Sequence, residues 1–448
     1  MISHIFREYD IRGIFPDELN EKSVYRLGRA FGTYFHEKGA HRISLGRDCR
    51  LSSPDLAVWL SRGLMASGMT IVDVGMVPTP ILYYTLHHLP LEGGIQITGS
   101  HNPPDFNGFK ICLGHASVYG EEIQAIRKIA ESEKFITAQG ALEKSRVDKS
   151  YIQHMVQNIH PGPRAVKAVV DGGNGVAGPP ALRIYRRLGF NIHPIFCEPD
   201  GRFPHHHPDP TIPDNLQSLT ETVHKEKADL GMAFDGDGDR IGVVDPEGGI
   251  IPADHLMMIF ARKLLMQHKG AKIIGDIKCT QALFDDIKAH GGNPIMWKSG
   301  HAITKSKMQE EGALLAGELS GHIFFKDRYF GYDDAIYAGA RLLEILSRTP
   351  EGLMSLIKGL PNLVNTPEIR LDCPETEKFK IVTTIADQFR KEHPVIDLDG
   401  ARILLGGGWG LIRASNTQPA LVLRFEAENE KRLEEIKNQF MEKVRKLI

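Results

Sequence analysis

The chain has 448 residues, of which 42% are hydrophobic and 25% are charged, as is usual for a globular enzyme. This length exceeds what one hydrophobic core supports, so we expect about three or four domains. The formal net charge of -2 excludes a strongly basic surface for nucleic acid. No uncharged apolar stretch approaches the roughly 20 residues that cross a bilayer, which excludes a membrane span.

Cysteine usage and the amino terminus indicate where the protein works. The 5 cysteines are scattered without a C-x-x-C pair, which argues against structural zinc and for a reducing compartment. Arg7, Glu8 and Asp10 precede any apolar core of signal-peptide length. We therefore expect a cytoplasmic protein without a nucleic-acid or membrane partner.

Short apolar runs recur along most of the chain, each followed by a polar or glycine-rich turn and then a helical pattern. Examples are the runs 42–45, 168–170 and 273–274, which are followed by GRD, DGGNG and GDIK. Such alternation is typical of βαβ units with parallel or mixed sheets. We therefore predict three α/β domains, with boundaries near residues 146, 248 and 362.

The segment 363–448 has a different texture and predicts a small α+β domain. Candidate strands lie at 368–371, 401–405, 410–414 and 421–426. The final helix carries five apolar residues near helical spacing, namely Leu433, Ile436, Phe440, Val444 and Leu447. This stripe is too short for a coiled coil, so we expect it to pack on the sheet.

A serine follows the strand-like run 94–98, in the sequence Thr98-Gly99-Ser100-His101-Asn102-Pro103-Pro104. Pro103 fixes its own φ and pushes Asn102 out of the helical region, which makes the turn stiff. Open α/β sheets bind ligands at the carboxyl ends of their strands, so we predict that Ser100 is functional. Neighbouring side chains of an extended chain point apart, so a serine-hydrolase pair of Ser100 and His101 is disfavoured.

Three consecutive histidines, His205-His206-His207, resemble a metal motif at first sight. The surrounding prolines indicate a rigid loop, and adjacent histidines do not share one face. We therefore predict a structural role for them rather than metal binding.

An acidic glycine loop, Asp235-Gly236-Asp237-Gly238-Asp239-Arg240, joins the apolar runs 230–234 and 241–244. Three carboxylates at alternate positions repel one another unless a cation binds them, and the glycines let the backbone wrap around it. A helix-loop-helix calcium site is excluded because Arg240 and Pro246 stand where that loop needs Gly and Glu. The pattern favours magnesium. The alternative is a phosphatase-like D-x-D motif in which Asp235 is phosphorylated.

Two later segments suit a phosphorylated sugar. Residues 413–419 (RASNTQP) combine an arginine fork, two hydroxyls and an amide, which fits a phosphate dianion. A capping or hydroxyl-turn cluster is the alternative explanation. Residues 317–322 (GELSGH) offer a carboxylate, a hydroxyl and an imidazole to sugar hydroxyls. Asp276, Lys278 and His301 add polar side chains after presumed strands.

These elements, in this order, resemble the α-D-phosphohexomutase superfamily, and most closely its bacterial-type phosphomannomutase/phosphoglucomutase branch. The resemblance covers essentially the whole chain, through residues 6–13, 46–48, 98–110, 171–175, 235–240, 317–322 and 413–419. Departures are small: His205, Thr280 and Gln418 stand where Asn, Ser and Glu are common.

The resemblance implies a fold and a catalytic group. Four domains would surround a central cleft. The first three would be related α/β domains: 1–146 with a phosphoserine loop, 147–248 with the metal loop and 249–362 with the sugar-binding loop. The fourth, 363–448, would be an α+β phosphate-binding domain similar to the TATA-binding protein fold. Ser100 would be carried as phosphoserine, with one Mg²⁺ held by a phosphoserine oxygen, Asp235, Asp237 and Asp239. Arg240 and Lys110 would assist, and Lys110, Arg12 or His101 would handle the proton of the attacking hydroxyl.

The resemblance also implies a substrate site and a reaction. Tyr9, Lys278 and His301 would line the cleft, Glu318, Ser320 and His322 would hold the sugar, and Arg413, Ser415, Asn416 and Thr417 would bind the substrate phosphate. The reaction would move a phosphoryl group between C1 and C6 of mannose or glucose phosphates through a bound hexose 1,6-bisphosphate. Glucose or mannose 1,6-bisphosphate would be the activator, and the enzyme would be a monomer or weak dimer. Phosphoglucosamine mutase, a sugar phosphatase using Asp235 and a non-catalytic sugar-phosphate binder are the alternatives.

Overall fold

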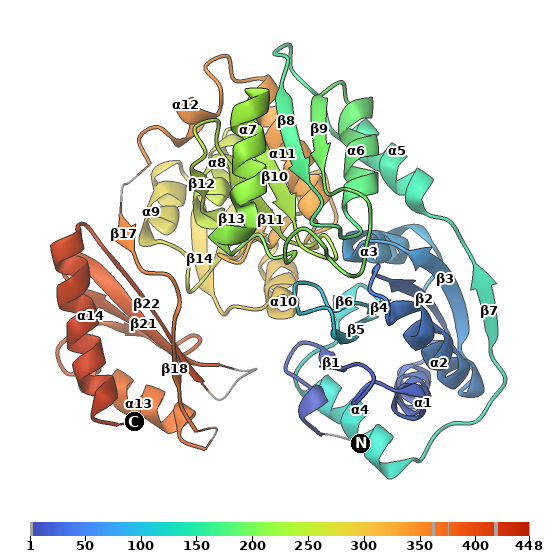
Figure 1. Cartoon of the computed structure of the whole chain (residues 1–448). Helices are drawn as coiled ribbons and strands as arrows, with labels where there is room; N and C mark the ends of the chain where they lie inside the picture. The colour runs from blue at the N-terminus through green and yellow to red at the C-terminus, as the bar shows by residue number, and fades with distance from the viewer. Residues whose placement is uncertain (1–2, 361–362, 375, 416–419, 448) are drawn as a thin grey trace.

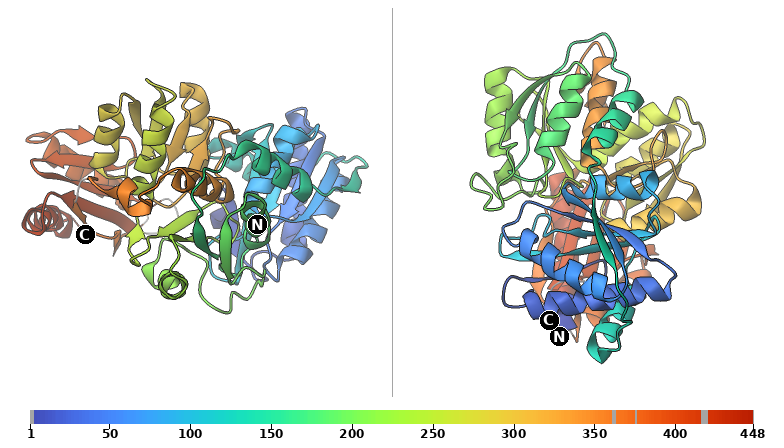
Figure 2. Two further views of the ribbon diagram at one scale, coloured as in Figure 1. Left: turned by 90° about the horizontal axis from the view of Figure 1, so that it is seen from above. Right: turned by 90° about the vertical axis from the view of Figure 1, so that its right-hand side faces the viewer.

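The computed structural model describes residues 3–360, 363–374, 376–415 and 420–447. Four β-sheets follow one another along the chain, and we number domains 1 to 4 after them (Figure 1). Domains 1 and 4 lie at opposite ends of the molecule, with domains 2 and 3 between them (Figures 1 and 2). In the described ranges no helix has both the length and the apolar character needed to cross a bilayer.

Domain 1 has a mixed sheet flanked by helices. Its strands are β1 (Ile11–Ile14), β2 (Arg42–Arg47), β3 (Thr70–Met76), β4 (Gly93–Ile97), β5 (Phe106–Leu113), β6 (Ala116–Ser117) and β7 (Ala141–Lys144), and its helices are η1 (Ser3–Ile5), α1 (Glu21–Glu37), α2 (Ser53–Ala66), α3 (Thr79–His88) and α4 (Glu121–Ser132). The strand order is β1-β5-β4-β2-β3-β7, with β6 beside β5. The strands β2, β3, β4 and β7 are parallel, whereas β5 is antiparallel to its neighbours.

Local sequence explains how domain 1 is built. Asn20 caps α1, because its side chain accepts the Ser23 N–H at 3.1 Å while the Ser23 hydroxyl accepts the Asn20 N–H at 2.9 Å. The helices α1 and α2 cross closely at Gly28, where a Cβ would lie 2.4 Å from the Leu60 carbonyl oxygen. A larger residue at this crossing would therefore force the two helices apart.

Domains 2 and 3 also have mixed sheets. Domain 2 contains β8 (Lys167–Asp171), β9 (Asn191–Ile195), β10 (Leu230–Phe234), β11 (Ile241–Val244) and β12 (Ile250–Ile251), in the order β12-β11-β10-β8-β9, with α5 (Asp148–Asn158), α6 (Gly178–Arg187), η2 (Pro213–Leu216) and α7 (Gln217–Glu226). Domain 3 contains β13 (Lys272–Asp276), β14 (Asn293–Trp297), β15 (Leu315–Gly317) and β16 (Ile323–Phe325), in the order β14-β13-β15-β16, with α8 (Ala253–Leu265), α9 (Gln281–Ala289), α10 (His301–Glu311), α11 (Ala335–Ser347) and α12 (Leu353–Ile357). In both sheets the central strands are parallel and the hairpins β10–β11 and β15–β16 are antiparallel.

One hydrophobic core joins the first three domains. It includes Leu82 of α3, Val170 of β8 and Leu283 of α9. The helix α11 follows the domain 3 sheet in sequence and packs both against β16 of that sheet and against α6, β10 and β11 of domain 2 (Figure 1). The first three domains are therefore packed against one another through this shared core.

Domain 4 is an antiparallel sheet with two helices and a core of its own. It contains β17 (Val364–Asn365), β18 (Ile369–Asp372), β19 (Val395–Ile396), β20 (Ala401–Leu405), β21 (Gly408–Ala414) and β22 (Ala420–Ala427), with α13 (Lys378–Arg390) and α14 (Glu430–Arg445). Four of the five predicted apolar residues of the last helix are buried, but Leu447 is 37% exposed because the helix ends at Arg445. The likeness to the TATA-binding protein stays a prediction.

The contact between domains 3 and 4 centres on one buried arginine. Arg402 of β20 donates to the carbonyl oxygens of Ile277 and Cys279, both at 2.8 Å, and its guanidinium lies 3.8 Å from the ring centroid of Trp409. Ile277, Trp409 and Leu411 form a small apolar cluster beside it. Domain 4 is therefore anchored at the loop that carries Lys278.

Candidate active site

Ser100 lies in the turn after β4, with only 2% of the residue exposed. Its hydroxyl donates to Asp235 Oδ2 at 2.7 Å, and His101 Nδ1 lies 3.1 Å from the same Oγ atom. The expectation that His101 points away from Ser100 is therefore wrong. Ser100 has φ of +48° rather than an extended backbone, and this left-handed turn brings the two side chains together.

The acidic loop joins β10 to β11 and wraps around Asp235. Asp235 Oδ1 accepts the backbone N–H groups of Gly238, Asp239 and Arg240 at 2.9, 3.1 and 3.2 Å. Gly238 has φ of +78°, a conformation that favours glycine. The carboxylates of Asp235, Asp237 and Asp239 are fully buried, and one oxygen of each lies within 4.8 Å of the others. The loop therefore has the compact form that the sequence predicted.

Lys110 of β5 partly balances the charge of this loop. Its Nζ atom donates to Asp237 Oδ2 at 2.6 Å and to Asp239 Oδ2 at 2.5 Å. Burial by itself lowers the pKa of Lys110, but Asp237 and Asp239 raise it above its ordinary value. Thr79, at the start of α3, donates a further hydrogen bond to Asp237 Oδ2 at 2.5 Å.

The loop retains oxygen atoms that suit a metal ion. Among the described residues, Oδ1 of Asp237 and Oδ1 of Asp239 are buried without a hydrogen-bond partner. Burial, together with the charges of Asp237 and Asp239, raises the pKa of Asp235 well above its ordinary value. A divalent cation would relieve both costs, because hard cations bind carboxylate oxygens. The donor set therefore fits a hard divalent cation.

Arginine side chains lie close to His101 and to the turn that carries Ser100. Arg12 of β1 donates to Asp10 Oδ2 at 2.7 Å and to Asn102 Oδ1 at 2.6 Å. Burial, followed by the charges of Arg240 and Arg12, holds the pKa of His101 well below its ordinary value. Burial and these charges therefore disfavour the protonated form of the His101 imidazole.

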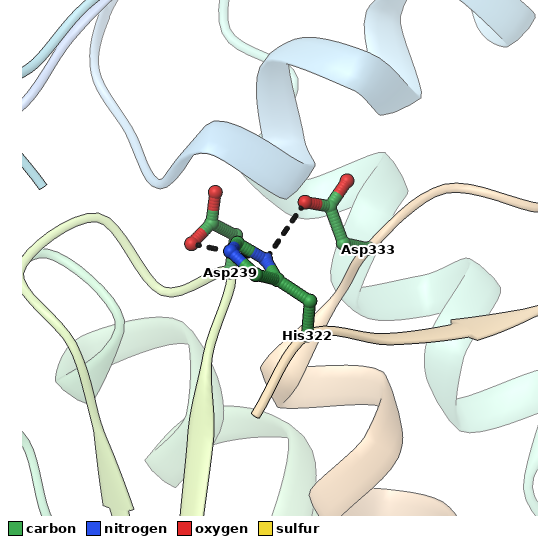
Figure 3. A group of neighbouring side chains, drawn as sticks. All are labelled: Asp239, His322 and Asp333. Atoms are coloured by element: carbon green, nitrogen blue, oxygen red, sulfur yellow. Dashed lines mark ion pairs between the residues drawn. The ribbon is translucent and has the colours of Figure 1, made fainter. Parts of the chain in front are cut away.

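His322 connects the acidic loop to domain 3 (Figure 3). Its Nδ1 atom lies 3.0 Å from Asp333 Oδ2 and 3.6 Å from Asp239 Oδ1, and its Nε2 atom accepts a hydrogen bond from Arg240 at 3.0 Å. Asp239, His322 and Asp333 have the spacing of metal ligands. Lys305, however, already donates to Asp333 Oδ1 at 3.1 Å, as Lys110 does to Asp239. The group is therefore better described as a buried ion-pair network.

The predicted sugar-binding residues of domain 3 lie beside this network. Glu318 Oε1 accepts the Thr304 hydroxyl at 2.9 Å, and the Ser320 hydroxyl donates to Glu318 Oε2 at 3.4 Å. Burial raises the pKa of Glu318 above its ordinary value. His301 stacks on His322 with ring centroids 5.5 Å apart. The fold therefore brings together four predicted residues, namely His301, Glu318, Ser320 and His322.

Contacts from domains 1 and 4 meet at the same edge of domain 3. Tyr9 donates to the Ser299 carbonyl oxygen at 3.0 Å, and Ser299 N–H donates to Asp399 Oδ2 at 3.3 Å. Asp399 in turn pairs with Arg413 at 2.7 Å. Lys278 Nζ lies 3.3 Å from Glu368 Oε1 of domain 4.

The predicted phosphate loop of domain 4 is described only in part. The carbonyl oxygen of Ser415 accepts a hydrogen bond from Lys378 Nζ of α13 at 2.6 Å, which joins the start of this loop to that helix. Asn416 and Thr417 lie outside the described residues.

The histidine triplet makes structural contacts. His205 stacks on Phe196 at 4.0 Å between ring centroids, and its Nδ1 atom lies 2.7 Å from Asn174 Oδ1. His206 Nε2 lies 3.0 Å from Asp171 Oδ2. Both histidines therefore hold the glycine-rich turn after β8.

The ion pair of His206 predicts a pH-dependent stability. Burial by itself lowers the pKa of His206, but Asp171 raises it above its ordinary value. This stabilisation is complete below the unfolded pKa, about 6.5, and is lost as the pH rises through the folded pKa. We expect His206→Gln to lower the melting temperature more at about pH 5.5 than at about pH 9. His268→Gln is the control and should show no such difference, because the His268 side chain is exposed and makes no described ion pair or side-chain hydrogen bond. Equal losses at both pH values would contradict the assignment.

Comparison with known proteins identifies the family. Models of the phosphoglucomutase/phosphomannomutase family match in chain order: alpha/beta/alpha domain I over residues 3–137, domain II over 149–248, domain III over 252–364 and the C-terminal domain over 368–443. A phosphomannomutase/phosphoglucomutase of Pseudomonas aeruginosa is 47% identical over 437 residues, which is 97% of this chain and 94% of the relative. A phosphoglucomutase of Neisseria gonorrhoeae is 45% identical over 441 residues, covering 97% of this chain and 95% of the relative.

A solved structure agrees with these sequence matches. A phosphoglucomutase/phosphomannomutase family protein of Burkholderia thailandensis superposes with a TM-score of 0.94 at 42% identity, covering 100% of this chain and 98% of the other. Fold and relatives together define a phosphohexomutase, which is an isomerase. Within that class, the chain belongs to the phosphoglucomutase/phosphomannomutase family. The predicted resemblance and the predicted α/β fold are confirmed.

Proposed function

We propose that the chain interconverts the 1-phosphates and 6-phosphates of mannose and glucose through phosphoserine 100. The observation that carries the proposal is the position of the Ser100 hydroxyl, 2.7 Å from Asp235 Oδ2 and 3.1 Å from His101 Nδ1. A buried hydroxyl between an acidic cation site and an imidazole is suited to carrying a phosphoryl group. The names of the Pseudomonas aeruginosa and Neisseria gonorrhoeae relatives support both sugars.

The groups around Ser100 then take distinct roles. The phosphoserine transfers its phosphoryl group to the free hydroxyl of a hexose 1-phosphate: the bond from phosphorus to the Ser100 oxygen breaks as the bond to the sugar oxygen forms. We assign the proton of that hydroxyl to His101, because its Nδ1 atom lies 3.1 Å from the Ser100 oxygen and the negative charge of the phosphoryl group would favour the imidazolium. Lys110 is charged and is held by two carboxylates, so we assign it to positioning and charge balance. Arg12 and Arg240 stabilise the phosphoryl oxygens.

Mg²⁺ would be held by a phosphoserine oxygen together with Asp235, Asp237 and Asp239. Bound there, the ion would neutralise the charge that develops on the transferring phosphoryl group. Glucose or mannose 1,6-bisphosphate would act as activator by restoring the phosphate to an unphosphorylated Ser100.

The substrate would bind between domains 3 and 4. Glu318, Ser320 and His322 would hold the sugar hydroxyls, with Tyr9, Lys278 and His301 around it. Arg413, Ser415, Asn416 and Thr417 would bind the phosphate that the substrate already carries. If Glu318 and Ser320 contact the 3- and 4-hydroxyls, the configuration at C2 goes unread, which explains acceptance of both sugars.

The reaction cycle requires the bound hexose 1,6-bisphosphate to turn, so that its second phosphate meets Ser100. Of the proposed domains 1–146, 147–248, 249–362 and 363–448, the last has its own core and would move about its contact with domain 3 at Arg402. We infer that the enzyme is cytoplasmic, acts on hexose phosphates and is a monomer or weak dimer.

A side-by-side assay tests the proposal. Mannose, glucose and glucosamine 1-phosphates are each supplied with Mg²⁺ and a trace of glucose 1,6-bisphosphate. We expect turnover of the first two and at least about 10-fold slower turnover of glucosamine 1-phosphate, because loss of a well-fitted substrate contact typically costs this much. Preference for glucosamine 1-phosphate, or hydrolysis without isomerisation, would refute the proposal.

A further inference from the structure

The backbone at Ser100 needs an external support. Its φ of +48° lies in the left-handed region, which a residue with a side chain adopts only when its surroundings impose it. The Ser100 N–H donates to Thr98 Oγ1 at 2.8 Å, but this contact lies within the same turn. The support has to come from another segment.

That support comes from Arg50, a fully buried residue in the loop between β2 and α2. Its guanidinium donates to carbonyl oxygens of the segment 100–106 and to no other backbone group that the structure describes. The acceptors are Ser100 at 2.8 Å, Asn102 at 2.5 Å, Phe106 at 2.9 Å and Pro103.

Asp48 supports the same turn from its other side. Asp48 Oδ2 accepts the Gly99 N–H at 3.1 Å and lies 3.3 Å from Arg50 Nε. Asp48 Oδ1 accepts the Arg50 N–H at 3.0 Å and the Ser53 hydroxyl at 2.5 Å. The N–H of Gly99 and the carbonyl oxygen of Ser100 are thus both held by the buried ion pair of Asp48 and Arg50.

Two close contacts show that the guanidinium determines the shape of the turn. A Cβ on Gly99 would lie 2.4 Å from Arg50 Nε, so only glycine lets the backbone approach it. The ring centroid of Phe203 in domain 2 lies 5.2 Å from Arg50 Cζ. Arg50 therefore ties the Ser100 turn to domain 2, the domain that carries the acidic loop.

We propose that Arg50 is a positioning residue for phosphoryl transfer, which fixes the backbone of Ser100 so that its oxygen faces the acidic loop. This inference rests on the proposed function of Ser100. Arg50 contacts neither Asp237 nor Asp239 and none of the predicted sugar-binding residues, according to the described hydrogen bonds and ion pairs. Its loss should therefore affect the transfer step and leave substrate binding intact.

Arg50→Lys is the informative substitution. Lysine keeps the charge, but its single ammonium cannot reproduce a planar fork that serves four carbonyl oxygens. We expect kcat with glucose 1-phosphate to fall about 100-fold, because misplacement of a reacting group by about 1 Å has this effect. KM should stay within about threefold, because the substrate contacts are unchanged.

Arg341→Lys is the matched control. Arg341 is also a buried arginine, paired with Asp327 at 3.0 Å, but it lies on α11 away from the Ser100 turn. Its variant should keep kcat even where its melting temperature falls. An unchanged kcat in Arg50→Lys, or a loss that only follows the unfolded fraction, would overturn the proposal.

Two further measurements keep the test decisive. If Arg50→Lys does not fold, Asp48→Asn is measured in its place, and a folded variant with unchanged kcat overturns the proposal. Peptide mapping of the wild type separates this inference from the proposed function. Absence of phosphate from Ser100 under turnover would refute the proposed function, whereas a phosphorylated wild type with a fully active Arg50→Lys variant refutes only the role of Arg50.

Discussion

Ser100→Ala should reduce the turnover of glucose 1-phosphate by about 10⁴-fold or more, because the variant has no group that can carry the phosphoryl. The fold should survive, since the Ser100 hydroxyl makes one described donor hydrogen bond, to Asp235, worth about 1 kcal/mol. The measurement is a coupled assay for the 6-phosphate product, together with the melting temperature and peptide mapping for phosphate.

Ser44→Ala is the matched control for this substitution. The Ser44 hydroxyl is also buried and accepts a hydrogen bond from Thr85 at 2.9 Å, but it lies within β2 away from the acidic loop. Its variant should keep the wild-type rate. If Ser100→Ala retained a tenth of the wild-type activity, or if a hydroxylamine-labile phosphate mapped to Asp235, the phosphatase-like alternative would replace the mutase mechanism.

The parts of the fold that depend on local pattern could be predicted from the sequence. The apolar runs at 42–45, 168–170 and 273–274 lie in β2, β8 and β13, because short runs bounded by turn residues leave few other structures. The position of α11 could not be predicted in this way. Its residues are buried on all sides, so periodicity gives no indication that it packs against domain 2 as well as against β16 of its own sheet.

The same distinction applies to the candidate site. Ser100 and the acidic loop stand out because their chemistry is concentrated in a few consecutive residues. Arg50 and Thr79 are isolated polar residues whose partners lie 50 and 158 positions away in sequence, so no local pattern marks them. The direction of His101 depended on one backbone angle, which the turn residues alone did not specify.

Two different groups can balance the negative charge of the acidic loop: the Lys110 ammonium and a bound cation. Lys110 neutralises the Oδ2 atoms of Asp237 and Asp239, whereas the Oδ1 atoms of both remain without a described hydrogen-bond partner. If a cation binds the Oδ1 side, enzyme activity must depend on Mg²⁺ even though Lys110 is in place. Removal of metal by a chelator should therefore abolish turnover, and added Mg²⁺ should restore it.

Asp237→Asn tests this division directly. The amide can still accept the Thr79 hydrogen bond, but it loses the charge that attracts a cation. We expect the Mg²⁺ concentration for half-maximal activity to rise at least about 10-fold, as is usual when a metal site loses a supporting group. The control is Asp245→Asn, because Asp245 Oδ1 accepts the N–H groups of Glu247 and Gly249 in a turn after β11, and asparagine can do the same. An unchanged Mg²⁺ requirement in Asp237→Asn would mean that Lys110, rather than a metal ion, balances Asp237 during the reaction.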